Sequence, residues 1–185
     1  MSRPVRMLVG VTALPTFDPG ALMAALDVER GDRALDWNQL AVVLWDQSAE
    51  LNARTVDHDM CSGALIRHRK GTPMSCHYAL ILLRWVRRQP EDFLTGRVVD
   101  VGRAPLPEAG PDKRLLFDLA QVHGALNERR IDGGLTWGQL ADEIGCTPSR
   151  LTNLRTAKLA DMDLTMRVTQ WLEAPAARFV HPADH

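Results

Sequence analysis

The chain has 185 residues, of which 45% are hydrophobic and 24% are charged, and its formal net charge is −1. This length allows one large domain or two small ones, and the composition is that of an ordinary globular protein. The near-neutral charge argues against nucleic-acid binding through bulk positive charge, so any such surface must come from a local arrangement of side chains. Five Trp against one Tyr, with few β-branched runs, favour helices over sheets.

Three cysteines, Cys61, Cys76 and Cys146, make an odd number in a chain for which we expect no signal peptide. The apolar stretch 7–14 is too short to cross a bilayer. We therefore expect a cytoplasmic protein with reduced thiols and no membrane association.

The chain contains two related segments. Residues 17–41 align without gaps on residues 117–141, with eleven of 25 positions identical, and the alignment resumes at an offset of 86, where Trp85 matches Trp171 and Phe93 matches Phe179. We interpret this pattern as a tandem duplication whose first copy carries 14 extra residues between Ala41 and Leu65. The extra material, roughly residues 45–59, is polar and is expected to hold a turn or two of helix around residues 49–54.

The predicted organisation begins with an arm at residues 1–16, in which residues 5–11 could form a strand. The first copy occupies 17–94, where Asp18 and Ser75 are expected N-caps. Its helices are predicted near 18–30, 36–45, 60–70 and 75–87, with a turn at 90–94. A linker rich in Gly and Pro follows at 95–110, and its 98–101 portion could pair with 5–11 as a minor sheet. The second copy spans 111–180, and the tail 181–185 is expected to be disordered.

Residues 135–172 carry the clearest pattern, read as two short helices joined by a tight turn and followed by two further helical segments. Thr136 is a plausible N-cap, and the apolar residues at 140, 141 and 144 form one stripe. Gly145 stands where the first helix must stop, because only glycine adopts the left-handed conformation without steric cost. Thr147 is the expected cap of the next helix, with Pro148 at its first position.

That next helix has two faces. Leu151 and Leu154 give it an inner side, and five polar residues are left pointing outward: Ser149, Arg150, Thr152, Asn153 and Arg155. A short polar helix held against a stabilising helix is what reading of the major groove requires. The pattern therefore predicts a helix-turn-helix.

The order of residues in this region, L-T-x-x-Q-L-A-x-x-I-G-C-T-P-S-x-L-x-x-L followed by D-x-D-L-x-x-x-V-x-x-W-L, resembles the Cro/C1-type, lambda-repressor-like helix-turn-helix family. The resemblance covers about 60 residues and implies an all-α fold of two such domains in tandem. It also implies a bacterial or phage transcriptional regulator that binds double-stranded DNA, usually as a dimer. Trp137 and Trp37 depart from the family, which usually has Gln there, and we interpret both as half-buried packing residues.

On the family pattern, the residues that reach base edges are Pro148, Ser149 and Asn153, with Arg150 and Thr152 alongside. Asn can pair with adenine and Arg with guanine or a phosphate. Backbone phosphate contacts are expected from Thr147, Arg155 and Lys158, and Thr136 is also a candidate. In the first copy the corresponding candidates are Ser62, Arg67, Arg69 and Lys70.

The first copy leaves three interpretations open: a second base reader, a phosphate clamp, or a degenerate copy kept for self-association. Gly63 and Ala64 stand where base-reading side chains would be, and the insertion replaces the tight turn. Because the copies have diverged, the favoured hypothesis is an asymmetric two-part DNA site bound by one chain, although a homodimer is possible.

Other chemistry has little support in the sequence. A metal site would draw on His58, Asp59, Cys61, His68, Cys76 and His77, but their spacing does not match a known ligand pattern. No phosphate loop, nucleophile elbow or placed carboxylate pair is recognisable, so we expect neither a cofactor nor enzymatic activity. The alternative to a DNA-binding regulator is a protein-interaction module that uses the same helical fold for a protein partner.

Overall fold

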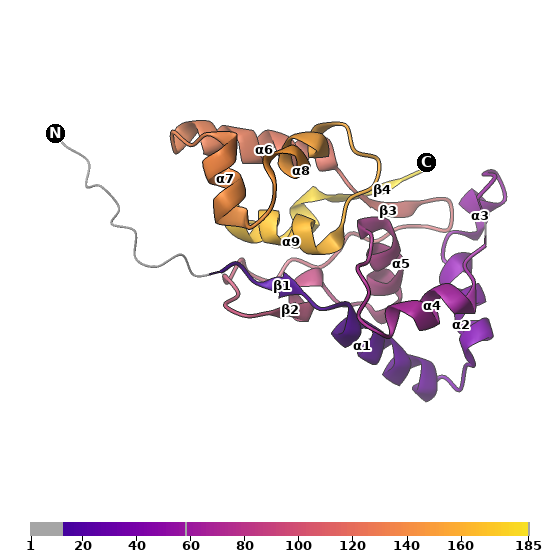
Figure 1. The fold of residues 1–185 in the computed structure, drawn as a ribbon. Helices are drawn as coiled ribbons and strands as arrows, with labels where there is room; N and C mark the ends of the chain where they lie inside the picture. Colours follow the sequence, from indigo (N-terminus) through magenta and orange to yellow (C-terminus); the bar gives the residue numbers. More distant parts are fainter. Residues whose placement is uncertain (1–12, 58, 185) are drawn as a thin grey trace.

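The computed structural model describes residues 13–57 and 59–184. The described chain is mostly helical and contains two small two-stranded sheets (Figure 1), so the prediction of a predominantly helical protein is confirmed. The elements corresponding to the first copy are β1 (Thr16–Phe17), α1 (Pro19–Asp32), α2 (Trp37–Asp46), α3 (Ala49–Asn52), α4 (Ser62–His68), α5 (Cys76–Val86), the 3-10 helix η1 (Pro90–Phe93) and β2 (Leu94–Thr95). Those of the second copy are β3 (Arg114–Phe117), α6 (Leu119–Asp132), α7 (Trp137–Ile144), α8 (Pro148–Thr152), η2 (Asn153–Arg155), α9 (Met162–Trp171), η3 (Ala176–Phe179) and β4 (Val180–Ala183).

The expected side-chain caps explain where several helices begin. Asp18 accepts a hydrogen bond from the backbone N–H of Ala21, and Ser75 accepts one from Tyr78. Thr136 and Gln139 form a reciprocal capping box at the start of α7. Each cap satisfies a backbone donor that the first helical turn leaves without a partner. These cap predictions are confirmed.

Corresponding residues of the two copies make the same contacts. The backbone N–H groups of Asp18 and Asp118 donate to the carbonyls of Phe93 and Phe179, each at 2.8 Å. The guanidinium groups of Arg30 and Arg130 bond the carbonyls five residues further along the chain. Most buried apolar side chains of both copies belong to one continuous core.

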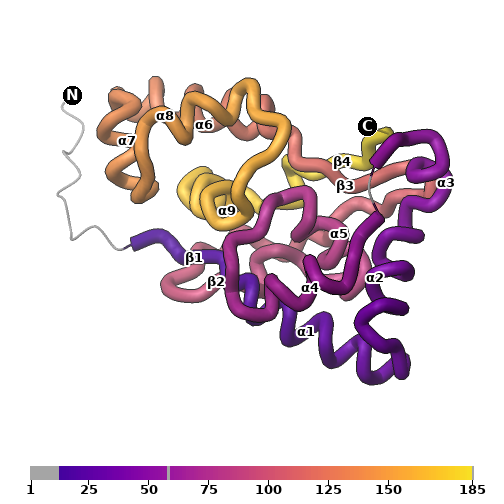
Figure 2. Tube along the Cα trace, turned by 45° about the vertical axis from the view of Figure 1, so that its right-hand side comes forward, coloured from indigo at the N-terminus to yellow at the C-terminus, as the bar shows by residue number. Residues whose placement is uncertain are grey.

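The copies meet through a nearly two-fold arrangement. The N–H of Cys76 donates to Ala160 at 2.8 Å, and the N–H of Met162 donates to Met74 at 2.9 Å, so equivalent positions bond each other in both directions. Helix α5 packs on β3 of the second copy, and α9 packs on β1 of the first. Figure 2 shows the segments that follow α4 and α8 approaching one another between the two copies. This reciprocal pattern is the one seen at interfaces between two subunits of a symmetric dimer.

A minor sheet does form where the arm and the linker meet the first copy, with Thr16 paired to Thr95, but the predicted strand at 98–101 is wrong. β1 pairs antiparallel with β2, and residues 98–101 form no strand. The N–H of Val99 instead donates to the side-chain oxygen of Gln170 at 2.7 Å, which satisfies backbone that a strand partner would otherwise bond. The other proposed partner, residues 5–11, lies outside the described residues. The prediction of a disordered tail is also wrong, since residues 181–183 belong to β4 and pair with β3.

The insertion in the first copy contains the predicted short helix, α3, and holds the segment that leads into the second copy. The N–H groups of Glu50 and Leu51 both donate to the carbonyl of Pro111 at 3.1 Å. Arg114 of β3 is 6% exposed, lies over the Trp45 ring, and binds Asp57 at 2.6 Å. The insertion therefore connects the two copies.

Gly145 ends α7 with φ 76°, the left-handed conformation predicted for it. We expect Gly145→Ala to lower the free energy of unfolding by about 1–2 kcal/mol, because a Cβ is strained at this φ. That Cβ would also lie 3.3 Å from Nη1 of Arg167. Urea unfolding measures the effect. Gly124→Ala in the interior of α6, where a Cβ meets nothing within 4 Å, should instead stabilise by about 0.5–1 kcal/mol. Equal effects of the two substitutions on the free energy of unfolding would contradict the assignment of a left-handed conformation to Gly145.

Candidate nucleic-acid interface

Helices α7 and α8 are joined by the three residues Gly145–Thr147. Leu140, Ala141 and Ile144 of α7 are buried, as predicted. Leu151 and Leu154 are at most 2% exposed and anchor the second segment against the core. Arg167 of α9 fixes the turn between the helices, because Nη1 of Arg167 donates to the carbonyls of Ile144 and Gly145 at 3.0 and 2.8 Å. The orientation of α8 relative to α7 is thus set by burial and by one arginine.

All of the candidate residues in the second copy are exposed. This set shares the solvent side of the α7–α8 unit and comprises Thr136, Thr147, Pro148, Ser149, Arg150, Thr152, Asn153, Arg155 and Lys158. Within the described chain, Arg150, Arg155 and Lys158 form no ion pair with an acidic side chain. The face therefore presents three positive charges that form no ion pair with the described residues.

Two local details differ from the sequence prediction. Thr147 occupies the cap position but makes no cap bond, and its hydroxyl lies 3.2 Å from that of Ser149. Asn153 and Arg155 lie in the 3-10 turn η2 and not in the α-helix, which ends at Thr152. The five-residue helix thus ends in a tighter 3-10 turn, an arrangement that is common at the C-termini of α-helices.

Trp137 is half-buried, as predicted, and lies behind the exposed face. Its ring stacks on His123 with 5.4 Å between centroids, and Arg130 lies over it at 4.7 Å. Burial lowers the pKa of His123, and the positive charges of Arg155 and Arg130 lower it further. Trp37 is half-buried in the same way between Arg30 and Arg69.

In the first copy, Arg67 of α4 is exposed, as are Arg69 and Lys70 directly after the helix, whereas Ser62 is half-buried. Arg69 is partly engaged, since it lies 3.9 Å from Asp27 and over the Trp37 ring. The residues between α2 and α4 form α3 and its flanking loops, so the pair has no tight turn. The structure thus brings the basic residues together but without the short connection of the second copy.

The two copies also differ in apolar exposure. Val42, Val43 and Ile66 of the first copy are 58%, 37% and 43% exposed, on α2 and α4. The aligned positions in the second copy hold Asp142, Glu143 and Thr152.

The candidate metal ligands have other surroundings. Cys76 is buried and its thiol lies 3.2 Å from the Thr165 hydroxyl, and burial raises its pKa to about 12. His68 is buried, hydrogen-bonds with Thr72, and packs against Tyr78 with the two rings tilted at 43°. Among residues 13–57 and 59–184, no three His, Cys, Asp or Glu side chains are grouped to hold a metal ion, and His58 lies outside this range. None of the described helices combines the length and the apolar run that crossing a bilayer demands.

One group of residues was missed by sequence reasoning. Arg33, Arg87 and Arg103, which are far apart in the sequence, line one hollow at the C-terminal end of α5. The only signal in the sequence is the pair Arg87-Arg88, which by itself is ordinary for the end of a helix.

Comparisons with models of protein families, with curated proteins and with solved structures gave no match to this chain. The resemblance to the lambda-repressor-like family therefore stays a prediction from the sequence pattern.

Proposed function

We propose that this protein is a sequence-specific, double-stranded DNA-binding transcriptional regulator, non-enzymatic in action, in which α7 and α8 form a helix-turn-helix. The observation that carries the proposal is the outward face of α8 and η2. Ser149, Arg150 and Asn153 are exposed there, while Leu151 and Leu154 hold the segment rigidly from behind. Arg and Asn are the side chains that read guanine and adenine in the major groove.

The charges around this face support phosphate contacts. Arg155 and Lys158 are exposed and have no acidic partner in the described part of the chain. Such side chains fix the register of a protein on the duplex without reading its sequence. Because the whole chain carries a formal charge of −1, affinity should depend on few phosphate contacts and should fall only modestly with salt.

The arrangement of the copies supports a two-part site read by one chain. DNA-binding dimers of this type place two recognition helices in successive major grooves, about 34 Å apart. The near two-fold relation of α5 and α9 resembles such a dimer within a single chain. Since Gly63, Ala64 and Arg67 of α4 replace Ser149, Arg150 and Asn153, the two half-sites are expected to differ.

The test is selection of bound sequences from a random duplex pool, followed by sequencing. Enrichment of a two-part motif is expected, with one unrelated half for each copy. A single short motif would restrict base reading to α8, and a palindrome bound by two chains would rule out the one-chain site. No enrichment at low salt by the folded protein would contradict the proposal.

A second candidate function, a protein-interaction module, is favoured by the exposed Val42, Val43 and Ile66. Apolar side chains at these positions suit contact with a protein better than contact with a phosphate backbone. The discriminating experiment is the duplex selection repeated with Val43→Asp and Ile66→Asp together. If α4 faces DNA, the second half of the motif should be lost. If it faces a protein, the enriched motif should be unchanged.

A further inference from the structure

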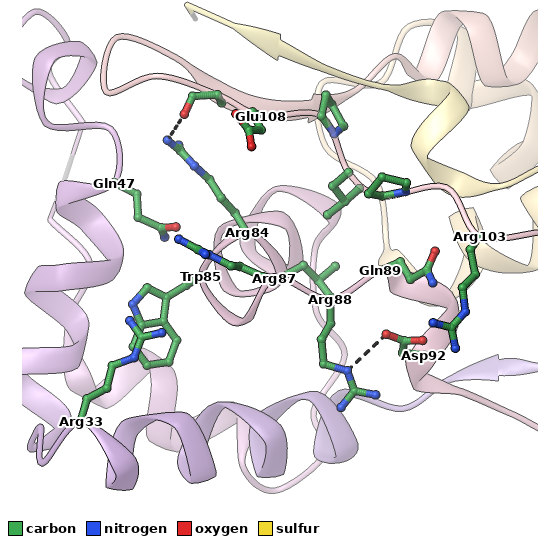
Figure 3. Close-up of a pocket in the computed structure, with 15 residues that line it drawn as sticks. Arg33, Gln47, Arg84, Trp85, Arg87, Arg88, Gln89, Asp92, Arg103 and Glu108 are labelled. Atoms are coloured by element: carbon green, nitrogen blue, oxygen red, sulfur yellow. Dashed lines mark hydrogen bonds and ion pairs between the residues drawn. The ribbon is translucent and has the colours of Figure 1, made fainter.

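A hollow lined by described residues lies at the C-terminal end of α5, where the linker at 103–109 passes over it. Its volume is about 950 Å³, within the range of small-molecule sites. Figure 3 shows Arg33 beside Trp85 on one side and Arg103 of the linker on the other, with Arg87 and Arg88 of the α5 terminus between them.

Positive charge is concentrated in this hollow. Its lining includes the arginines at 33, 84, 87, 88 and 103, against the two carboxylates Asp92 and Glu108. The chain as a whole has a formal charge of −1, so this excess is local.

The arginines differ in how far they are engaged. Arg84 is committed to the fold, since it donates to the carbonyl of Ala109 at 2.6 Å, and Arg88 pairs with Asp92 at 3.2 Å. Arg87 and Arg103 are exposed and form no ion pair with any side chain in the described ranges. Two guanidinium groups are thus left to bind something else.

The second copy shows that the fold does not require these arginines. The aligned positions of Arg33, Arg84, Arg87 and Arg88 hold Gly133, Gln170, Glu173 and Ala174.

The helix ends themselves are alike, because Arg87 and Glu173 share a φ of 53°. In the second copy, however, Glu173 pairs with Arg129 at 2.9 Å and completes the local charge balance. Positive side chains stabilise the C-terminus of any helix, and this effect would apply equally to both copies. It therefore does not explain why only the first copy has arginines at these positions.

We infer that this hollow binds a small molecule with two or more oxyanion groups, phosphate or carboxylate. The fork of a guanidinium group matches such oxygens in pairs. Pro105, Leu106 and Pro107 supply an apolar wall for the rest of the ligand. The site is separate from the proposed DNA interface, because the N-terminus of α5 contacts the loop after α8. The hollow lies at the other end of this 11-residue helix, roughly 16 Å away.

Binding should fasten the linker to the first copy, since Arg103 belongs to the linker and Arg87 to α5. The test is isothermal titration of the full chain at low salt with pyrophosphate, ATP and citrate, which separates phosphate from carboxylate ligands. We expect saturable binding of at least one of them, with shifts of the Arg87 and Arg103 Nε–H signals in NMR spectra. Arg87→Gln with Arg103→Gln should weaken binding by about a hundredfold, roughly tenfold for each arginine.

Two controls make the result specific. Arg97→Gln removes the same charge from an exposed linker arginine outside the hollow and should leave binding unchanged. Arg150→Ala should also leave it unchanged, which separates this site from the DNA interface. No saturable binding of any of the three anions, or equal loss in the Arg97 variant, would overturn the inference. If the hollow bound duplex DNA and none of the three anions, and if the Arg87 and Arg103 substitutions abolished that binding, the hollow would be a nucleic-acid surface and the inference would be overturned.

Discussion

Replacing Arg150 and Asn153 together by alanine is expected to lower the affinity for the selected duplex at least about a hundredfold. Each good contact between such a side chain and a base edge contributes about 1–3 kcal/mol of discrimination, and 1.4 kcal/mol is a tenfold change. Both side chains are exposed, so stability should change by less than about 0.5 kcal/mol. Fluorescence anisotropy with the selected duplex and with a scrambled duplex measures the effect.

The scrambled duplex tests the assigned roles. The double variant should bind it almost as well as the unmodified protein does, because base contacts and not charge are the main loss. Lys158→Ala should instead weaken binding to both duplexes alike. It should also reduce the slope of the logarithm of the binding constant against the logarithm of the salt concentration by about one. Arg97→Ala, which changes an exposed linker arginine outside the hollow, is the matched control and should affect neither duplex. Unchanged affinity of the double variant for the selected duplex would exclude α8 as the reading element.

Arg114→Ala is expected to lower the free energy of unfolding by about 2–4 kcal/mol. Arg114 is 6% exposed and binds Asp57 and Asn52 of the insertion, with its guanidinium 4.7 Å from the centre of the Trp45 ring. Alanine would remove the charge-assisted bonds and leave a void between β3 and the insertion. Chemical denaturation monitored by Trp fluorescence and by circular dichroism measures the change.

Asp57→Asn is the matched comparison for Arg114. The Asp57 side chain is 49% exposed, so water screens its attraction to Arg114, and the expected loss is below about 1 kcal/mol. The hydrogen bond from Arg114 lowers the pKa of Asp57. The interaction between Asp57 and Arg114 therefore stabilises the folded state fully above the ordinary carboxyl pKa of 3.8. This stabilisation is lost as the pH falls through the lowered pKa of Asp57. Equal losses for the two variants, or a penalty that persists undiminished in acid, would contradict this account.

The elements with strong local signals were predictable from the sequence. The caps at Asp18, Ser75 and Thr136 and the left-handed Gly145 occupy their predicted places. Each depends on a few neighbouring residues, because a cap or a helix-ending glycine acts within one turn of helix. The inner and outer faces of α8 were equally local, since they follow from helical spacing.

Features that depend on partners distant in the sequence were not predictable in the same way. The 98–101 stretch has the composition of a strand, yet its backbone bonds Gln170, and the tail becomes ordered because residues 180–183 pair with β3. Such pairing depends on which segments the fold brings together, and strand propensity is weak beside that context.

The sequence by itself determined the helical character of this protein, the correspondence of its two copies, and the exposed Arg150 of α8 and Asn153 of η2. These features follow from periodicity, capping and identity at fixed offsets. Only the tertiary structure decided how the copies meet. Three features join residues that are distant in the chain. They are the near two-fold contact between Ser75 and Asp161, the contacts of the insertion with Arg114, and the hollow lined by arginines from the C-terminal ends of α1 and α5 and from the linker. Their positions were settled by burial of a core shared between both copies.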